Sequence, residues 1–380
     1  MGLFVDALPQ FPWDSLDGAR ARAGQHPGGI VDLSIGTPID PTPAVVREAL
    51  VAAADAPGYP TTHGTEELRR AVVDWFARRR GVTGLTPDAV LPTIGSKELV
   101  AALPGLLGLG EGDVVVHPRI AYPTYDVGAR LVGATPWPAD ATTAVGPGRV
   151  RLLWLNSPSN PTGQVLGVAH LAKVVAWARQ RGVVVVSDEC YAELAWAEPW
   201  ASDGVPSLLD PRVTGGSHEG LLVLYSASKQ SNLAGYRAAF AAGDPAIVDR
   251  LLATRKHTGM MMPTPVQAAL GAALGDDEHV AAQRETYRRR RELLLASVRA
   301  AGLVVGEGNE AGLYLWAALP EDSPLDGRGI VAALAERGIL VAPGEFYGPA
   351  GARHVRIALT ATDERIAAAA DRLHEAAPLH

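Results

Sequence analysis

Short apolar segments that alternate with helical stretches constrain the fold of this chain most strongly. Strand-like runs are expected at residues 90–94, 113–116, 150–155, 182–187, 221–226 and 238–242, with helical spacing between or beside them. Parallel strands need long crossover connections, which are usually helices, so this alternation predicts a mostly parallel sheet with helices on both faces. The chain is therefore expected to be an α/β protein.

The pattern also divides the chain into three parts. Residues 1–44 are irregular and rich in proline, and we expect them to form an amino-terminal arm and part of a smaller domain. Residues 45–275 carry the alternating pattern and form the expected large domain. Residues 276–380 form the expected small carboxyl-terminal α/β domain, with strands at 312–316, 339–342 and 355–359. One long charged helix over about 266–300 is expected to connect the two.

Bulk properties exclude several classes of protein. The net charge of −7 and the lack of a basic run argue against nucleic-acid binding. A single cysteine, Cys190, excludes an internal disulfide framework and fits a reducing compartment. No apolar stretch approaches the ~20 residues that span a bilayer, and the amino terminus lacks a basic segment followed by an apolar run, so no signal peptide is expected. The histidines show no metal-ligand spacing. We expect a cytoplasmic protein without a bound metal.

Lys229 lies directly after the apolar run 221–225, where a charged amine is costly to desolvate unless it is used. Ser226 and Ser228 precede it, and Arg237 follows in a stretch of small residues. A desolvated amine is the nucleophile that captures carbonyl compounds and pyridoxal phosphate, and the hydroxyls and the arginine suit a phosphate site beside it. A surface lysine in a polar turn is the alternative.

Other expected strands also end in polar residues, and ligands of open α/β sheets bind at such ends. Gly95-Ser96-Lys97 opens a helix, which indicates either a phosphate cradle or an ordinary helix cap. Asn160, in Asn160-Pro161-Thr162-Gly163, can donate its amide to a phenolate-like oxygen or belong to a plain loop. Asp188 ends a valine-rich strand and, facing a pyridine nitrogen, would keep it protonated.

Aromatic and basic residues add to this set. Tyr191 can contact a hydroxyl on the ring of a ligand, or it can pack as an ordinary buried aromatic residue. Tyr122 and Tyr59 can contact a ligand or pack in the core. Arg356 lies within the apolar strand Val355–Leu359, where an unpaired guanidinium is costly, so a carboxylate partner is expected. That carboxylate belongs either to a substrate, which an arginine fork recognises bidentately, or to a structural salt bridge.

The order and spacing of Asn160-Pro161-Thr162-Gly163, Asp188 to Tyr191, and Ser226-Ala227-Ser228-Lys229 to Arg237 resemble those of the fold-type-I pyridoxal phosphate-dependent aminotransferases. The resemblance covers essentially the whole chain. It implies a large domain with a mostly parallel seven-stranded sheet, a smaller α/β domain, and a homodimer with shared active sites.

The same resemblance implies a role for each site residue. Lys229 would bind pyridoxal 5'-phosphate as a Schiff base and act as the base of the proton shift, with Asp188 at the pyridine nitrogen. Tyr191 and Asn160 would hold the ring oxygen, and Tyr122 would stack on the ring. The implied phosphate and substrate ligands are Gly95, Ser96, Lys97, Ser226, Ser228, Arg237 and, from a second subunit, Tyr59 for the phosphate, and Gly36, Asn160 and Arg356 for the substrate.

A narrower resemblance concerns the substrate. The strings Phe11-Pro12-Trp13-Asp14, Leu153 to Pro158, Arg255 to Met261 and Phe346 to Gly351 are similar to actinobacterial succinyldiaminopimelate aminotransferases of lysine biosynthesis. That family implies amino transfer between glutamate and N-succinyl-2-amino-6-oxopimelate. Two alternatives stay open: an aminotransferase of other or broad specificity, and a pyridoxal phosphate-dependent C–S β-lyase. A cofactor-sensing regulatory domain is disfavoured, because no DNA-binding segment precedes the first strand.

Overall fold

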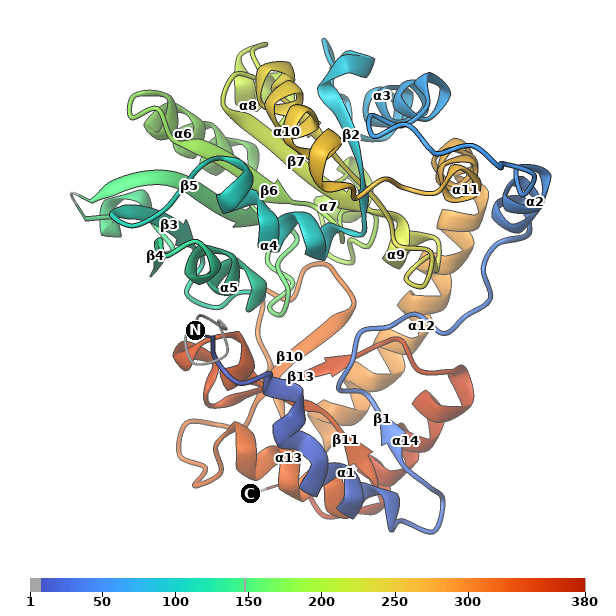
Figure 1. Ribbon diagram of the computed structural model, residues 1–380. Helices are drawn as coiled ribbons and strands as arrows, with labels where there is room; N and C mark the ends of the chain where they lie inside the picture. Colours follow the sequence, from blue (N-terminus) through green and yellow to red (C-terminus); the bar gives the residue numbers. More distant parts are fainter. Residues whose placement is uncertain (1–7, 147, 380) are drawn as a thin grey trace, which may run out of the picture.

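Two lobes joined by a long helix make up the computed structural model, which describes residues 8–146 and 148–379 (Figure 1). Residues 1–7, 147 and 380 lie outside the described residues. Residues 1–7 are the first part of the expected amino-terminal arm. They are also the start of the segment that was expected to lack a signal peptide. Within the described ranges, no helix is long and apolar enough to cross a membrane.

The upper lobe is built on a seven-stranded sheet in the order β2-β8-β7-β6-β5-β3-β4. Its strands are β2 (Val90–Ile94), β3 (Asp113–His117), β4 (Thr135–Pro138), β5 (Arg149–Asn156), β6 (Val184–Asp188), β7 (Leu221–Ser226) and β8 (Ala238–Gly243). Neighbours pair in parallel, except that β8 is antiparallel to both β2 and β7. The expected mostly parallel seven-stranded sheet is therefore confirmed.

Helices cover both faces of this sheet, as the buried apolar runs of its central strands require. On one face pack α2 (Ala44–Ala52), α3 (Glu66–Arg80), α6 (Val168–Arg179), α8 (Pro211–Thr214) and α11 (Thr264–Gly275). On the other pack α4 (Ser96–Leu106), α5 (Thr124–Leu131) and α10 (Pro245–Thr258). Short helices α7 (Trp200–Asp203) and α9 (Ala227–Gln230) and the 3-10 turns η3 (Pro87–Ala89) and η4 (Thr142–Ala144) lie in connections.

The lower lobe has its own apolar core. Its four-stranded sheet has the order β12-β13-β10-β9, and β1 pairs in parallel with β11. The strands are β1 (Val31–Asp32), β9 (Val304–Val305), β10 (Tyr314–Ala318), β11 (Ile339–Leu340), β12 (Ala342–Pro343) and β13 (His354–Ala358); the helices are α1 (Asp17–Gly24), α12 (Glu278–Ala300), α13 (Gly327–Glu336) and α14 (Asp363–Glu375), with 3-10 turns η2 (Pro12–Leu16), η5 (Gly344–Tyr347) and η6 (Pro349–Gly351).

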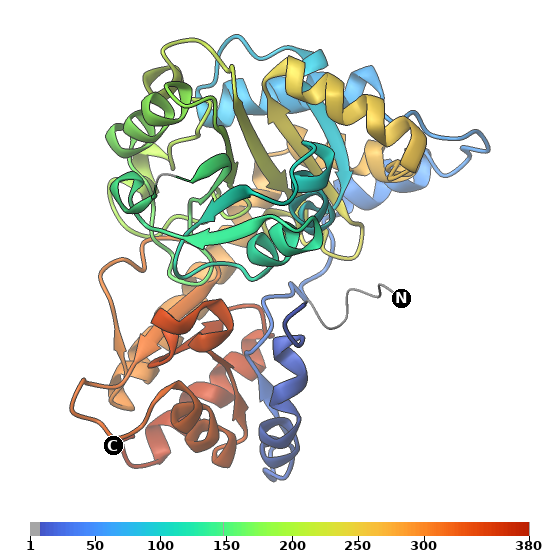
Figure 2. The same cartoon turned by 60° about the vertical axis from the view of Figure 1, so that its left-hand side comes forward.

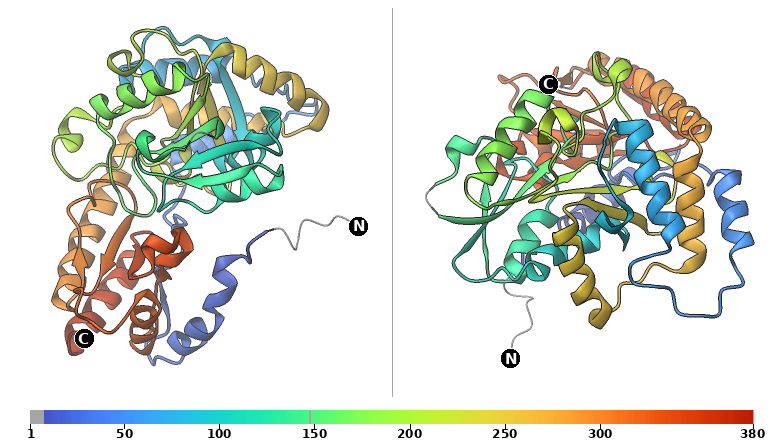
Figure 3. Two further views of the ribbon diagram at one scale, coloured as in Figure 1. Left: turned by 90° about the vertical axis from the view of Figure 1, so that its left-hand side faces the viewer. Right: turned by 90° about the horizontal axis from the view of Figure 1, so that it is seen from above.

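Two segments connect the lobes. Residues 33–43 run from β1 to α2, and α12 descends from the upper lobe along the lower one (Figure 2). The amino-terminal helix α1 packs beside α13 of the carboxyl-terminal part, where the left view of Figure 3 shows it in blue next to orange and red elements. The lower lobe thus combines both ends of the described chain.

Two features differ from the sequence-based expectations. The single helix expected over 266–300 is wrong: α11 ends at Gly275, Asp276 is extended (φ −115°, ψ 111°), and its side chain accepts a 2.9 Å hydrogen bond from the backbone N–H of Glu278 at the start of α12. An aspartate in this position offers the backbone an alternative to a continuous helix. Strand β4 was not expected, because Pro136 and Pro138 argue against a strand; it lies at the sheet edge, where proline is tolerated.

Candidate active site

The polar residues that follow the strands meet at one edge of the large sheet. Asn156, Asp188 and Ser226 end β5, β6 and β7, and Asn156 is paired in register with Asp188. A cavity of about 420 Å³ opens at this edge, between the two lobes. Its lining residues are Phe11, Trp13, Ile35, Gly36, Thr37, Ser96, Lys97, Tyr122, Asn156, Asn160, Asp188, Cys190, Tyr191, Ser226, Ser228, Lys229, Ala234, Arg237, Tyr314 and Arg356.

The cavity brings together every site residue predicted from the sequence except Gly95 and Tyr59. Gly95 lies directly behind the lining, against Arg237. Tyr59 is 96% exposed, in the loop between α2 and α3. The roles of all these residues stay predictions, and their contacts indicate what each can do.

Lys229 extends into the cavity from α9, the single turn that follows β7. Its Nζ donates a hydrogen bond to the backbone carbonyl of Gly36, on the segment that joins the lobes. Burial lowers the pKa of Lys229, and the nearby Arg356 guanidinium acts in the same direction, while Tyr314 opposes it. A lysine with a lowered pKa has a larger neutral, nucleophilic fraction than an ordinary lysine at the same pH.

Asp188 presents a carboxylate that has no cationic partner within the described ranges. Its Oδ2 accepts a 3.0 Å hydrogen bond from the Tyr125 hydroxyl, and Oδ1 accepts one of 3.2 Å from the Cys190 backbone N–H. Burial raises the pKa of Asp188 above its ordinary value, and these hydrogen bonds and Lys229 only partly offset the effect. A buried carboxylate of this kind suits a ligand that brings a positive charge.

The neighbouring acid has a different role. Glu189 forms a buried ion pair with Arg80, with 3.1 Å between Oε2 and Nη2, away from the cavity. Glu189 also accepts a 2.7 Å hydrogen bond from the Leu208 backbone N–H. One carboxylate therefore serves the core and the other faces the cavity.

An anion cradle lies at the start of α4. The backbone N–H groups of Ser96 and Lys97 open this helix, where amides have no intrahelical acceptor. The Ser226 and Ser228 hydroxyls are 2.7 Å apart, and Arg237 contributes its guanidinium. Gly95 has φ +75°, and a Cβ there would lie 2.1 Å from Nη2 of Arg237, so only glycine allows this approach. Hydroxyls, amides and a guanidinium suit a phosphate group.

Arg356 is buried in β13, with 3% of its surface exposed, and no carboxylate among the described residues pairs with it. Its Nη1 donates to Asn160 Oδ1 (3.0 Å) and its Nη2 to the Ser34 carbonyl (2.8 Å), but Nε has no partner there. The guanidinium lies 4.0 Å from the ring centroid of Tyr314. The structural salt bridge considered from the sequence does not form within the described chain, and a carboxylate ligand fits the free donors.

Two tyrosine hydroxyls meet on the lower-lobe side of the cavity. The hydroxyl oxygens of Tyr191 and Tyr314 are 3.1 Å apart. Burial alone would raise the pKa of Tyr314, but Arg356 and Lys229 outweigh it and lower that pKa. The pKa of Tyr191 is raised by burial and by Tyr314. Burial also raises the pKa of Tyr122 to about 12, so its hydroxyl stays protonated.

The Aminotransferase class I and II family matches residues 29–373. A probable aminotransferase of Mycobacterium tuberculosis is 61% identical over 368 residues, which cover 97% of this chain and 85% of the relative. The chain belongs to the class I and II aminotransferases. The fold-type-I aminotransferase predicted from the sequence is confirmed.

Two further similarities bear on specificity. A 4-dedimethylamino-4-oxo-anhydrotetracycline transaminase of Streptomyces rimosus is 55% identical to this aminotransferase, over 96% of this chain and 99% of the relative. The solved structure of a probable N-succinyldiaminopimelate aminotransferase from Thermus thermophilus superposes with a TM-score of 0.85 at 30% identity, covering 96% of this chain and 100% of that one.

Sequence reasoning missed several residues around the cavity of this aminotransferase. Tyr314 sits in the expected strand 312–316, but only the antiparallel pairing of β10 with β13 brings it to the face of Arg356. Tyr125, three residues after Tyr122 in the sequence, was given no role from the sequence. Asn156 orients the following loop, because its Oδ1 accepts a 2.7 Å hydrogen bond from the Asn160 backbone N–H. The signal for Asn156 in the sequence was its position at the end of an expected strand. The remaining missed lining residues are Phe11, Trp13, Ile35, Thr37, Cys190 and Ala234.

Proposed function

We propose that this aminotransferase uses pyridoxal 5'-phosphate to move an amino group between glutamate and N-succinyl-2-amino-6-oxopimelate, as a succinyldiaminopimelate transaminase of lysine and diaminopimelate biosynthesis. One observation carries the proposal. A single cavity holds an amine with a lowered pKa, a carboxylate without a cation and a guanidinium without a carboxylate, on Lys229, Asp188 and Arg356 of the described chain. These are the complements of an aldehyde, a pyridine nitrogen and a substrate carboxylate.

The donor set of the cavity fits pyridoxal phosphate. Ser96, Ser226, Ser228 and Arg237 would hold the phosphate, and Asp188 the pyridine nitrogen. Asn160 has its Oδ1 occupied by Arg356, which leaves its amide nitrogen to donate to the ring oxygen beside Tyr191, and Tyr122 would cover a ring face. When bound, this cofactor draws electrons from the α-carbon of an amino acid.

The residues of the chain supply binding and proton transfer. Arg356 orients the α-carboxylate of glutamate through its free N–H donors, with Asn160 and the Ser34 carbonyl fixing the guanidinium. Lys229, whose lowered pKa favours the neutral amine, would take the proton from the α-carbon of the amino donor. The donor would leave as its keto acid once water supplies the oxygen that replaces its amino group, and the same residues would serve the second substrate in reverse.

Lys97 supports an acceptor with a distal carboxylate. Its backbone opens α4 toward the phosphate cradle, whereas its side chain lies over the Phe11 ring, with Nζ 5.6 Å from the ring centroid. No acidic group of the described residues pairs with it. Phe11 and Trp13 form an apolar wall beside this ammonium. A substrate with an aliphatic chain that ends in a carboxylate would fit this part of the cavity. Arg119 and Lys256, two other cations of the chain, are exposed and do not line the cavity.

A second specificity has its own support. The Streptomyces rimosus relative is a transaminase of a tetracycline intermediate, and aromatic walls such as Phe11 and Trp13 also suit a flat polycyclic ketone. A C–S β-lyase activity is the remaining alternative, and it would need no keto acid.

The assembly is proposed to be a cytoplasmic homodimer. Tyr59 is 96% exposed and lies outside the cavity of its own chain, which agrees with a role at the phosphate site of a second subunit. Tyr59→Phe would then weaken cofactor binding, although the residue has no contact with the cavity of its own subunit.

The decisive experiment is a panel of keto acids offered to the purified holoenzyme after its half-reaction with glutamate. We expect N-succinyl-2-amino-6-oxopimelate to be preferred over analogues without the succinyl carboxylate, and Lys97→Met to reduce that preference about tenfold. Arg119→Met is the matched control and should leave it unchanged. Preference for a polycyclic ketone, or release of ammonia and pyruvate without a keto acid, would support the alternatives instead. A Lys229→Ala variant that turns over normally would refute the aminotransferase site itself.

A further inference from the structure

A partly buried ion pair joins the segment between the lobes to α12. The guanidinium of Arg290 binds both carboxylate oxygens of Asp40, at 2.7 Å from Nη1 and 2.6 Å from Nη2. The Arg290 side chain is 5% exposed and that of Asp40 is 18% exposed. Arg290 and Gln283 together lower the pKa of Asp40, although burial opposes them. The two parallel N–H to oxygen contacts hold the guanidinium and the carboxylate in one relative orientation. Their partial burial limits the screening of this ion pair by salt.

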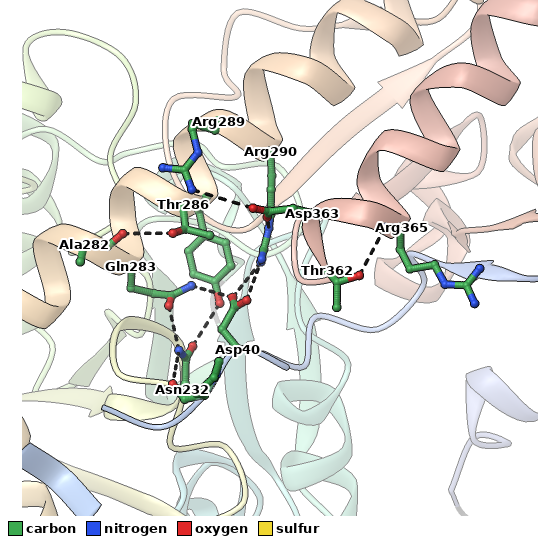
Figure 4. Close-up of polar contacts among 12 residues, drawn as sticks. Asp40, Asn232, Ala282, Gln283, Thr286, Arg289, Arg290, Thr362, Asp363 and Arg365 are labelled. Carbon is green, nitrogen blue, oxygen red and sulfur yellow. Dashed lines mark hydrogen bonds and ion pairs between the residues drawn. The ribbon is translucent and has the colours of Figure 1, made fainter. Parts of the chain in front are cut away.

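The ion pair extends to the loop that follows Lys229. Gln283 donates to Asp40 (2.9 Å) and accepts from the Asn232 side-chain amide (2.8 Å), which also lies 3.2 Å from the Pro41 carbonyl (Figure 4). Asn232 adopts a left-handed conformation with φ 56°, which asparagine tolerates better than most residues. We call Asp40, Gln283, Asn232 and Arg290 the Asp40 clamp.

The segment held by this clamp provides two contacts within the cavity. The Gly36 carbonyl accepts from Lys229 Nζ, and the Ser34 carbonyl accepts from Arg356 Nη2. Both carbonyls lie on the same short stretch as Asp40. The clamp thus ties together the loop after Lys229 and the backbone that orients the two cationic side chains.

We propose that Asp40 and Arg290 are positioning residues: they fix the Ser34–Pro41 backbone so that Arg356 and Lys229 are set for the carboxylate and the amine of the amino donor. The inference rests on the proposed roles of Lys229 and Arg356, not on the identity of the acceptor. Asp40 and Arg290 do not line the cavity, so an effect of these residues on ligand affinity would have to pass through the Ser34–Pro41 segment.

Arg290 offers a matched control within one side chain. Its Nε also donates to Asp363 (2.5 Å), which is 63% exposed, begins α14 and makes no hydrogen bond with the described Ser34–Pro41 segment. Asp40→Asn and Asp363→Asn each remove one carboxylate from the same guanidinium and preserve its shape. Only the first weakens the link to the cavity.

The test compares these variants as holoenzymes. For Asp40→Asn we expect the KM for glutamate, and the Kd of the unreactive dicarboxylate glutarate, to rise about tenfold, with a smaller change in kcat. Amide hydrogen exchange at residues 34–40 should accelerate. Asp363→Asn should leave glutarate affinity unchanged even if it lowers the melting temperature equally, which a purely structural role would not predict.

Two further variants test the inference if Asp40→Asn does not fold. Gln283→Met keeps both charges paired, and it should raise the glutarate Kd in the same direction by less. Arg290→Lys keeps the charge without the fork, and should resemble Asp40→Asn. Equal glutarate affinity in Asp40→Asn, Gln283→Met and the unmodified enzyme would overturn the inference. If glutamate is no donor at all, the proposed function fails, whereas faster exchange of residues 34–40 in Asp40→Asn alone would still support the clamp.

Discussion

The Tyr125 hydroxyl donates a 3.0 Å hydrogen bond to Oδ2 of Asp188, and Tyr125 itself is stacked on Trp154 with ring centroids 5.0 Å apart. The stacking fixes the ring in α5, so the hydroxyl holds the carboxylate in one orientation. Asp188 lacks a cation within the described chain, and Tyr125 is the side-chain hydroxyl that donates to it. The pair determines how the carboxylate can meet a ligand.

Loss of the Tyr125 hydroxyl should therefore reduce activity without removing the charge of Asp188. Tyr125→Phe is expected to lower kcat/KM about threefold to tenfold, because it removes one hydrogen bond and leaves the carboxylate in place. Asp188→Asn is expected to lower it about tenfold to a hundredfold, because it removes the charge itself. Steady-state kinetics and cofactor Kd measure both. Tyr347→Phe is the control, since its buried hydroxyl has no described partner. Equal losses in Tyr125→Phe and Tyr347→Phe would contradict the assignment.

Replacing the guanidinium of Arg356 should mainly affect the amino donor. Lysine keeps the positive charge but loses the fork that holds Asn160, Ser34 and a carboxylate together, so Arg356→Lys is expected to raise the KM for glutamate about tenfold or more. Arg212→Lys serves as the control, because the exposed Arg212 also pairs with a carboxylate, that of the buried Asp210, outside the cavity. Donor kinetics that do not change in Arg356→Lys would show that another residue binds the α-carboxylate.

The lowered pKa of Lys229 predicts selective capture of aldehydes by the apoenzyme. The neutral fraction of its amine rises with pH and should level off below pH 10.5, where ordinary exposed lysines are still mostly protonated. Borohydride trapping of pyridoxal phosphate across pH, followed by peptide mass spectrometry, compares Lys229 with the exposed Lys173 and Lys256. Labelling of Lys229 no faster than that of Lys256 at pH 7 would refute the prediction.

The same pKa has a consequence for stability. Between the lowered pKa of Lys229 and 10.5, the unfolded chain binds more protons than the folded one, so the free energy of unfolding of the apoenzyme should rise with pH in this window. Lys229→Met should remove that contribution. Denaturant titrations of both proteins at several pH values measure it, and identical pH slopes would argue against it.

Gly95 offers a test of the anion cradle. Gly95→Ala places a methyl group against the Arg237 guanidinium, and it also strains a backbone with φ +75°, at a cost of about 1 kcal/mol. Gly108→Ala carries a similar strain, with φ +73° and open space around it. We expect only Gly95→Ala to weaken the binding of pyridoxal phosphate, measured by absorbance titration. Similar affinity losses in both variants would exclude a specific clash.

The fold and much of the cavity followed from local patterns. Apolar runs ending in Ser226, Asp188 and Asn156 marked strands whose carboxyl ends must lie at one edge of the sheet. The interruption at Asp276 was missed, because apolar spacing continues on both sides of it. The edge strand β4 was missed because of its prolines.

The unpredicted parts of the cavity depend on long-range pairing. Tyr314 reaches Arg356 through the pairing of β10 with β13, and Phe11 reaches Lys97 from the amino-terminal segment. The Asp40 clamp joins residues that are distant in the sequence. No local periodicity encodes such contacts, and a sequence shows only that these side chains are chemically suited to them.

The direction of β8 restricts how this protein can vary. Because β8 is antiparallel to its neighbours, Arg237 at its start lies beside the carboxyl ends of β2 and β7. The chain between Lys229 and Arg237 must therefore stay short enough to keep both residues at this edge of the sheet. Insertions there would separate Arg237 from Lys229 at the cavity. The turn at residues 216–220 lies at the opposite rim of the sheet, and natural variation in loop length should be concentrated on that side.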